Sequence, residues 1–345
     1  MRIVIVGATG NVGTGLLRRL QESEQEHELV GIARRRPNAG TAPYAGVQWH
    51  EADVSDPRSR GRLARLFAGA DAVVHLAWLL QPNRRERVMR ATNVDGHRHA
   101  IAAAVDAGVP HLVVVTSVAS YSPGPKATRV DERWPTGGVH TSHYSRHKAA
   151  TERMLDALER NHPQVRLTRV RPGFVFQRDA AAELARLFIG RHRPSRWLGR
   201  IRLPVLPVPR RAVGQAVHAD DLGDAITRIV EQRAGGAFNI AAEPVLDPEA
   251  LRRVLGARAV VPVPFEVARS AVWASWALGI HATDPGWLDL AVTVPVMSTE
   301  RARTELGWEP RHRSTEALRE VLDGIGEGAH VPASPPLSPS SPPSA

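Results

Sequence analysis

The sequence predicts an α/β fold built on a doubly wound parallel sheet, with a smaller mixed region in its C-terminal half. Short apolar runs alternate with helical stretches over the first 240 or so residues, as in folds whose helices cover both faces of a sheet. The first apolar run, residues 2–6, leads through a glycine-rich turn directly into a helical pattern. The runs are rich in Val, Leu and Ile, which is typical of parallel strands that are buried on both faces.

The expected elements follow in order along the chain. After residues 2–6, the apolar positions Val12, Leu16, Leu17 and Leu20 have helical spacing and predict the first helix. Further buried strands are expected at 29–32, 47–49, 72–76, 112–116, 167–170 and 238–240. Helices are expected between most of them, at 58–68, 85–107, 143–160 and 219–231.

The alternation breaks after Pro172 and returns at 212–241. The predicted domains are therefore a Rossmann-type domain from 1–172 plus 212–244, and a smaller region from 173–211 plus 245–325. Within the smaller region we expect a helix at 248–256 behind an Asp247 cap, a strand at 259–264, and a helix from Ser298 to Leu306 that ends at Gly307.

Residues 326–345 are predicted to be a disordered tail. The last fifteen residues contain six Pro and five Ser, a composition that cannot bury a core of its own.

Composition excludes several classes of protein. The 345 residues contain no cysteine, which excludes a disulfide scaffold, a thiolate zinc site and a cysteine nucleophile. The longest apolar stretch, 267–280, is interrupted by Arg269 and is too short to cross a bilayer. The N-terminus lacks the features of a signal peptide. We expect a soluble, cytoplasmic protein without a membrane span.

The net charge of +10 is concentrated in one segment. Between Arg191 and Arg211 there are seven arginines and no acid, so the segment could be a solvated loop, a pocket for an anionic substrate, or a patch for nucleic acid or membrane. Trp197 is its only aromatic residue, which argues against stacking on single strands. We expect a small-molecule substrate, of which an anion is one candidate, and no specific nucleic-acid partner.

The turn after the first strand reads Gly7-Ala8-Thr9-Gly10-Asn11-Val12-Gly13. Glycines spaced in this way let backbone amides approach a pyrophosphate at a helix N-terminus. The motif predicts dinucleotide binding, and the alternative is a merely tight turn.

The end of the second strand carries Arg34, Arg35 and Arg36 where an NAD-preferring site has an acid. Arginine pairs well with phosphate, so NADP(H) is the favoured cofactor and NAD(H) remains an alternative. The other interpretation is a solvated basic loop.

Asp53 and Val54 follow the third strand. A carboxylate at this position can accept a hydrogen bond from the adenine amino group, although Asp53 could equally serve as a turn or helix cap.

Tyr144 and Lys148 are four residues apart on a predicted helix and therefore share one face. A lysine ammonium favours tyrosinate, and such a tyrosine can exchange a proton with a substrate oxygen. The chain holds three tyrosines and only two lysines, so chance expects roughly 0.02 such pairs. Thr116 and Ser117 end the fifth strand, where a hydroxyl could bind the reacting oxygen.

His140, His143 and His147 have a spacing that allows zinc ligation in principle. Because this segment enters the Tyr144 helix, we expect no metal. Trp273 and Trp276 are expected in the core or at an interface.

Together these features resemble the extended short-chain dehydrogenase/reductase family, the NAD-dependent epimerase/dehydratase group, over roughly residues 1–320. The further segments that carry the resemblance are His75-Leu76-Ala77, Asn93-Val94-Asp95-Gly96, Thr116 to Tyr121, Arg171-Pro172-Gly173-Phe174-Val175-Phe176, Val217 to Leu222, and Ser298 to Pro310.

The resemblance implies a role for each matching position. The glycine-rich loop, including Asn11 and Val12, would face the pyrophosphate, and Asp53 and Val54 would meet the adenine. The remaining cofactor-binding positions would be Thr9, Arg34, Leu76, Ala77, Trp78, Asn93, Thr116, Pro172 and Gly173. Ser117 would orient the substrate oxygen, Tyr144 would be the acid/base, and Lys148 would serve Tyr144 and the ribose. The 173–211 segment would supply substrate contacts.

The sequence departs from the family pattern at two further points. Phe176-Gln177-Arg178 replaces the usual Y-G-P, which weakens an assignment of nucleotide-sugar contacts. Val118 follows Ser117 where sugar dehydratases have Glu, so dehydration is disfavoured. The expected function is an NAD(P)-dependent oxidoreductase or epimerase acting on a secondary alcohol or ketone, with a nucleotide sugar as one candidate and a homodimer as one allowed assembly. The alternative is a non-catalytic NAD(P)-binding sensor or scaffold.

Overall fold

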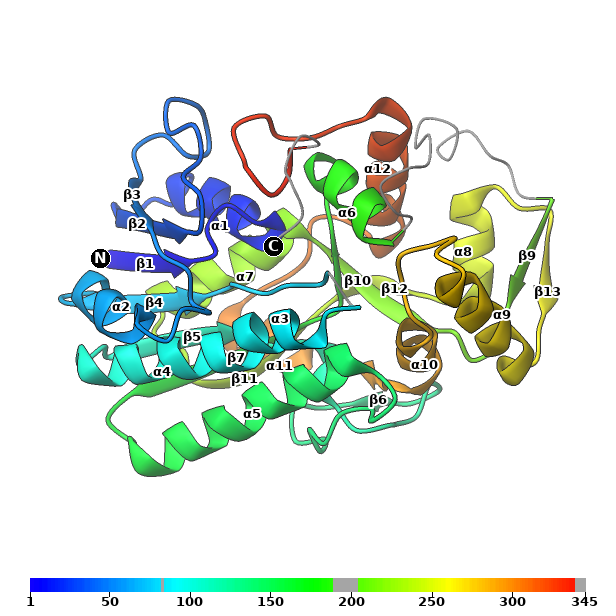
Figure 1. The fold of residues 1–345 in the computed structure, drawn as a ribbon, viewed down its shortest axis with the longest axis horizontal. Coiled ribbons are helices and arrows are strands. Elements are labelled where there is room, and N and C mark those ends of the chain that lie inside the picture. Colours follow the sequence, from blue (N-terminus) through cyan, green and yellow to red (C-terminus); the bar gives the residue numbers. More distant parts are fainter. Residues whose placement is uncertain (82–83, 189–203, 339–345) are drawn as a thin grey trace.

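The computed structural model describes residues 1–81, 84–188 and 204–338, and its centre is a seven-stranded sheet (Figure 1). Every neighbouring pair in this sheet is parallel. The strand order is β11 (Gly236–Ile240), β7 (Arg166–Pro172), β5 (His111–Val115), β4 (Ala72–His75), β1 (Arg2–Val6), β2 (Glu28–Ala33) and β3 (Gln48–Glu51). The predicted doubly wound sheet is confirmed, with the change in winding direction between β1 and β4.

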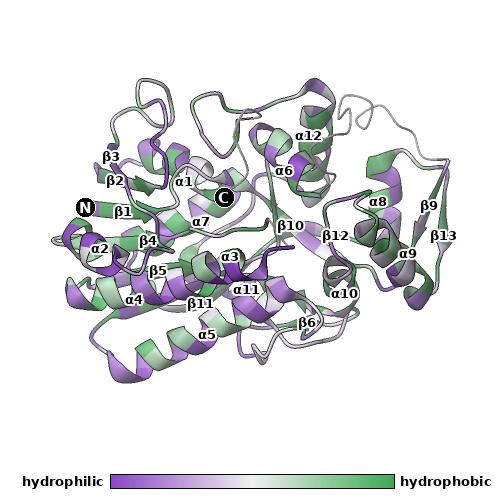
Figure 2. Cartoon of the chain, viewed as in Figure 1, coloured by the Kyte–Doolittle hydropathy of each residue, from purple (hydrophilic) through white to green (hydrophobic). Residues whose placement is uncertain are grey.

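The strands are buried on both faces, as their composition predicts. Along β1 successive side chains alternate, so Ile3 and Ile5 join one core cluster while Val4 and Val6 join the other. Helices α1 (Asn11–Gln21) and α7 (Ala219–Glu231) contribute to the first cluster. The second cluster includes side chains of α2 (Ser59–Phe67), α4 (Gly96–Asp106) and α5 (His143–Asn161). Figure 2 shows mixed hydrophilic and hydrophobic colouring along α5, as expected of a helix with one face on the sheet.

The helix expected at 85–107 is divided into three pieces. It consists of α3 (Glu86–Arg90), a π-helical turn η1 (Ala91–Asp95) and α4. Within η1 the Asn93 side chain exchanges two hydrogen bonds with the backbone of Leu79, at 2.7 and 2.8 Å. The wide turn thus ties the helix to the loop that follows β4.

Besides the seven-stranded sheet, the described residues form three short sheets and several further helices. The three-stranded sheet joins β12 (Ala242–Leu246), β10 (Gly214–His218) and β8 (Phe174–Phe176). The sheet combines segments from both predicted domains, so their boundaries stay a prediction. The other elements are η2 (Val118–Ser120), β6 (Arg129–Val130), η3 (Arg178–Ala180), α6 (Ala181–Phe188), β9 (Val205–Val208), α8 (Pro248–Leu255), β13 (Ala259–Pro262), α9 (Phe265–Ala277), α10 (Gly286–Thr293), β14 (Val296–Met297), α11 (Glu300–Leu306) and α12 (Ser314–Glu327).

The predicted helix signals are mostly reproduced. The Asp247 carboxylate accepts from the Ala250 amide at 2.7 Å at the start of α8. Helix α11 begins at Glu300, behind Thr299, although the Ser298 hydroxyl still accepts from the Glu300 amide at 3.3 Å. Gly307 ends that helix with φ +60°, a conformation that glycine adopts at low cost.

The tail predicted to be disordered, residues 326–345, is described as far as Ser338 and packs against other elements there. Helix α12 extends to Glu327, and both Ser334 and Leu337 are fully buried. Leu337 packs into a cluster that also contains Leu184 and Val321 of α6 and α12. The composition shows that the tail cannot form a core of its own, but here it uses a core that other elements supply. Residues 339–345 lie outside the described residues.

Two further expectations concern the tryptophans of α9 and the absence of a membrane span. Trp273 on α9 is 55% exposed, so it does not belong to the core. No helix in the described part of the chain is long and apolar enough to cross a membrane.

Candidate active site

A cavity of about 610 Å³ lies at the carboxyl edge of the parallel sheet, beside the loops after β1 and β4. Its lining includes every predicted site residue except Asp53 and Asn93. The predicted residues that line it are Gly7, Thr9, Gly10, Asn11, Val12, Gly13, Arg34, Val54, Leu76, Ala77, Trp78, Thr116, Ser117, Tyr144, Lys148, Pro172 and Gly173. The fold therefore brings together segments that span almost half of the chain.

The glycine-rich loop is shaped by close backbone contacts. Gly7 has φ +88°, and a Cβ there would lie 2.7 Å from the amide nitrogen of Ala77. A Cβ on Gly13 would lie 2.5 Å from the carbonyl oxygen of Ala8. Helix α1 begins at Asn11 without a side-chain cap, so its first amides are available to a ligand. The loop fits the pyrophosphate of a dinucleotide.

Arg34 and Arg35 line the cavity directly after β2. Partial burial lowers the pKa of the Arg34 guanidinium, and the nearby Asp53 carboxylate opposes that shift. Asp53 itself does not line the cavity, because its Oδ1 accepts hydrogen bonds from the amide and hydroxyl of Ser55 at 2.8 and 2.6 Å. These bonds fit the alternative in which Asp53 stabilises a turn, and the adenine contact stays a prediction.

Asn93 also lies outside the lining. It is fully buried behind Leu79, which does line the cavity. It supports the wall of the cavity through the backbone of Leu79.

Tyr144 lies in the first turn of α5, whose N-terminus is capped by Ser142 accepting from the Ser145 amide at 3.4 Å. Burial raises the pKa of Tyr144 to about 12, and a hydrogen bond with Ser117 opposes the shift. The Ser117 hydroxyl also accepts from the Ala119 amide at 3.1 Å, which orients it at the end of β5. The two predicted hydroxyls therefore meet in the cavity.

Lys148 lies one turn further along α5. Its ammonium donates to the Val115 carbonyl at 3.1 Å and lies 5.9 Å from the centroid of the Tyr144 ring. Burial lowers the pKa of Lys148 to about 7, and the Glu152 carboxylate opposes the shift. The site thus holds an ammonium that can lose its proton near neutral pH.

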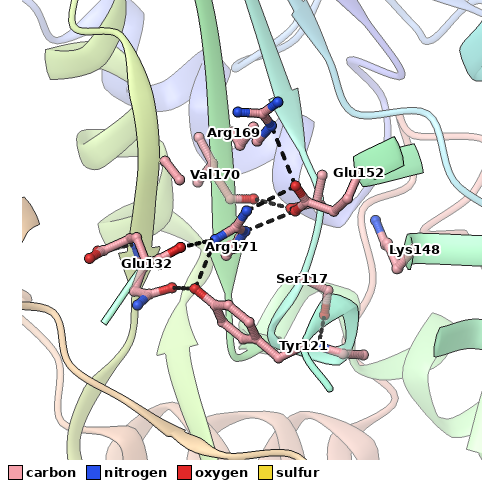
Figure 3. Close-up of polar contacts among 12 residues, drawn as sticks. Ser117, Tyr121, Glu132, Lys148, Glu152, Arg169, Val170 and Arg171 are labelled. Atoms are coloured by element: carbon pink, nitrogen blue, oxygen red, sulfur yellow. Dashed lines mark hydrogen bonds and ion pairs between the residues drawn. The ribbon is translucent and has the colours of Figure 1, made fainter. Parts of the chain in front are cut away.

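A buried ion pair fixes helix α5, which carries Tyr144 and Lys148. No local pattern in the sequence indicated this pair. Arg171 donates to both carboxylate oxygens of Glu152, at 2.8 and 2.9 Å, and to the Tyr121 hydroxyl at 3.0 Å. Figure 3 shows Arg171 between Glu152, Tyr121 and Glu132, with Lys148 nearby. The Thr116 hydroxyl also donates to Glu152, at 2.8 Å. Glu152 is four residues beyond Lys148, a spacing that could have indicated its place on the same helix face.

An aromatic wall adjoins Tyr144, and most of it was not predicted. We define the aromatic wall as Trp78, Phe174, Phe188 and Trp287, all of which line the cavity. The Trp287 ring centroid lies 4.9 Å from that of Tyr144 and 5.0 Å from that of Phe188. These rings come from four separate segments, so no local pattern in the sequence could have grouped them.

The chain end reaches the same cavity. The Ser334 hydroxyl donates to the Thr9 carbonyl at 2.7 Å, and Pro336 lines the cavity. Arg186 of α6 donates to the Pro336 and Ser338 carbonyls at 2.8 and 3.2 Å. The tail therefore connects the glycine-rich loop with the smaller region. The predicted substrate segment 173–211 contributes Phe174, but its residues 189–203 lie outside the described residues.

The histidines at 140, 143 and 147 form no close donor cluster in the described residues. His143 instead pairs with Asp284 at 3.3 Å. Among the described residues, the side chains that lie close enough together to bind one metal ion are His218, His312 and Glu320. His218 Nδ1 accepts from the Asp220 amide at 3.2 Å and Nε2 lies 3.2 Å from Glu320, so hydrogen bonds account for this group.

A sequence model of one protein family, described as the NAD dependent epimerase/dehydratase family, matches residues 3–241. The chain belongs to this family. Its membership confirms the resemblance drawn from the motifs.

Two relatives align over almost their full length. A 4-hydroxy-2-methyl-3-oxo-4-farnesyl-3,4-dihydroquinoline-1-oxide ketoreductase of Stigmatella aurantiaca is 26% identical, with 95% of this chain and 98% of that protein covered. A 3-diazoavenalumate denitrifying reductase of a Streptomyces species is 27% identical, with 94% and 99% covered. An uncharacterized protein of Mycobacterium tuberculosis is 26% identical over 93% of this chain, which spans only 29% of that protein.

Solved structures show the same fold. UDP-glucose-4-epimerase from Stenotrophomonas maltophila, with bound NAD and formylated UDP-arabinopyranose, gives a TM-score of 0.69 at 20% identity, covering 95% of this chain and 98% of that one. UDP-glucose 4-epimerase from Thermus thermophilus, in complex with NAD, gives 0.66 at 18% identity, covering 94% and 99%. These likenesses support the predicted Rossmann-type architecture.

Proposed function

We propose that the chain is an NAD(P)H-dependent reductase that converts a ketone into a secondary alcohol, with Tyr144 as the proton donor. The observation that carries the proposal is the meeting of Tyr144, Ser117 and Lys148 at one cavity that also contains the glycine-rich loop. The Stigmatella and Streptomyces relatives, which match over almost their full length, are named as reductases, and the name of the Stigmatella protein describes a 3-oxo group on a dihydroquinoline oxide.

The bound reduced nicotinamide supplies the hydride that the carbonyl carbon accepts. The protein's own groups handle the proton. Ser117 donates a hydrogen bond to the carbonyl oxygen, and Tyr144 transfers its hydroxyl proton to that oxygen. The Lys148 ammonium stabilises the tyrosinate that remains, which then regains a proton from solvent. Each turnover consumes one ketone, one reduced cofactor and one proton.

NADP(H) is the cofactor that we propose. Two cationic side chains, Arg34 and Arg35, line the cavity after β2, and arginine suits a 2′-phosphate. NAD(H) is the alternative, because the solved structures of similar fold contain NAD. Titration of tryptophan fluorescence with NADPH and NADH measures the preference. Arg34→Ala should weaken NADPH binding and leave NADH binding unchanged, whereas equal losses for both would favour NAD(H).

An epimerase is the second candidate, since the solved structures of similar fold include epimerases. Net consumption of reduced cofactor separates the two activities. A reductase oxidises one cofactor per product, whereas an epimerase returns its cofactor to the starting state. If neither NADPH nor NADH raises the melting temperature or quenches tryptophan fluorescence, both proposals fail. A cytoplasmic location and a homodimer remain predictions that cell fractionation and light scattering can test.

A further inference from the structure

The substrate end of the cavity is bounded by aromatic rings. Trp78 and Trp287 both pack against Tyr144, with ring centroids 5.7 and 4.9 Å from that of the Tyr144 ring. Phe188 meets Trp287 edge to face at 5.0 Å, and Phe174 lies 6.4 Å from Trp287. Such rings bind another aromatic ring in stacked or edge-to-face geometry.

Two polar atoms of this wall lack partners. The indole Nε1 atoms of Trp78 and Trp287 are buried, and neither has a hydrogen-bond partner among the described residues. A buried N–H without an acceptor is costly, so native structures usually satisfy it with protein, water or ligand. Both residues line the cavity, but their Nε1 atoms are themselves inaccessible, so a ligand in the cavity contacts the rings rather than the N–H groups.

The described lining also carries charged side chains, and one of them, Lys148, lies 3.6 Å from the centroid of the Trp78 ring. Arg34 and Arg35 lie after β2 at the cofactor end, and Lys148 lies beside Tyr144. Arg186 is engaged by the carbonyls of Pro336 and Ser338. Glu183, a buried acid whose pKa is raised to about 7 by burial, also lines the cavity. Among the described residues, Lys148 and Arg186 already donate to backbone carbonyls, so this end of the cavity favours an uncharged substrate over a sugar diphosphate.

We infer that the substrate is an uncharged ketone conjugated to an aromatic ring system, bound against the rings of Trp78 and Trp287. The inference rests on the proposed reductase function and defines the substrate class of that same site. The conjugated carbonyl takes the hydride at carbon and the Tyr144 proton at oxygen, giving a benzylic alcohol and oxidised cofactor. No other reactant is required.

The test compares three probes with the intact protein saturated with NADPH. 1-Tetralone is an aryl ketone, 1-decalone has a similar bicyclic shape without the aromatic ring, and UDP-glucose represents nucleotide sugars. We expect kcat/KM for tetralone to exceed that for decalone by about tenfold, which is the scale of an aromatic pair. UDP-glucose should neither react nor compete with tetralone.

Two substitutions of Trp287 measure the contribution of its aromatic ring. Trp287→Leu should raise KM for tetralone about tenfold and leave the value for decalone within about twofold. Trp287→Phe keeps an aromatic ring and should give an intermediate rise in KM for tetralone. This variant replaces Trp287→Leu in the test if the leucine variant does not fold. Trp273→Leu on exposed α9 is the matched control and should change neither value.

Several results would overturn the inference. One is equal kcat/KM for tetralone and decalone, and another is displacement of tetralone by UDP-glucose at lower concentration than by a second aryl ketone. A third is the absence of tetralone binding to the NADPH complex, measured by fluorescence quenching in Trp273→Leu. In all three cases the reductase proposal still holds if NADPH binds. If neither NADPH nor NADH binds, the reductase proposal itself is overturned.

Discussion

The Lys148 ammonium nitrogen lies 3.6 Å from the centroid of the Trp78 ring. An indole face attracts a cation, and the Val115 carbonyl accepts one of its protons. Burial nevertheless lowers the pKa of Lys148 to about 7. The chain therefore keeps a lysine whose charged form is costly in the folded state, which is expected of a functional group rather than a structural one.

Lys148→Met should stabilise the unliganded protein. The pKa falls from 10.5 in the unfolded chain to about 7 in the folded one, so between these values the unfolded chain binds a proton that the folded chain does not. Stability is therefore lost as pH falls from 10.5 towards 7, and methionine removes this cost. We expect the melting temperature at pH 7 to rise by a few degrees while ketone reduction is lost.

Lys126→Met provides the control for that experiment. Lys126 is the other lysine, burial lowers its pKa to about 7, and it donates to the Val213 carbonyl at 2.7 Å without lining the cavity. The Lys126→Met substitution should raise the melting temperature by a similar amount and leave kcat unchanged. A lower melting temperature for Lys148→Met would contradict the assigned cost of burial.

Cofactor affinity should depend on pH through the same lysine. Above pH 7 the free protein loses the Lys148 proton, so binding of an anionic cofactor must recover it. The Kd for NADPH, measured by fluorescence titration, should rise between pH 7 and 8.5 by up to about tenfold per unit. In Lys148→Met the same curve should be flat over this range, and an unchanged slope would assign the titration to another group.

Glu152→Gln should destabilise the protein strongly. The substitution leaves the Arg171 guanidinium buried without its ion pair, a change that typically costs about 3–5 kcal/mol. Denaturant unfolding followed by circular dichroism measures the loss. Asp106→Asn is the control, because Asp106 also forms a two-pronged pair, with Arg60 at 2.6 and 2.7 Å, but on the surface. If both variants unfold at the wild-type midpoint, the buried pair is not what fixes α5.

Removal of the packed tail should weaken cofactor binding. A chain that ends at His330 loses the Ser334 contact with the Thr9 carbonyl of the glycine-rich loop. Loss of this hydrogen bond should raise the Kd for NADPH about 2–12-fold. A chain that ends at Ser338 keeps this contact and should match the full-length protein. Equal affinities in all three chains would leave the tail without a role at the cofactor site.

Sequence patterns predicted the parts of this structure that depend on interactions between residues close together in the chain. The strand–turn–helix at Gly7 and the Tyr144–Lys148 face of α5 follow from spacing along a few residues, and the sheet confirms their placement at one edge. Asp53 could not be resolved in the same way, since a carboxylate after a strand serves a ligand or a turn equally well. Its bond to the Ser55 hydroxyl is consistent with the turn, and the adenine contact stays a prediction.

Long-range partners account for what the sequence did not reveal. Trp287 meets Tyr144 across more than 140 residues, and Leu337 enters a cluster built by α6 and α12. Neither residue has a periodic neighbour that would indicate its place. The Arg171–Glu152 pair is an intermediate case, because the Arg171-Pro172 motif was visible but its partner was not.

Single-turnover reduction by the NADPH complex of Tyr144→Phe tests the central claim most directly. The ketone is the one that the wild-type protein reduces fastest, and the oxidation of NADPH is followed by absorbance. The account predicts a rate lower by about 10²–10⁴-fold, with the Kd for NADPH within about twofold of wild type. A rate equal to that of the wild-type protein would contradict the assignment of Tyr144 as the proton donor.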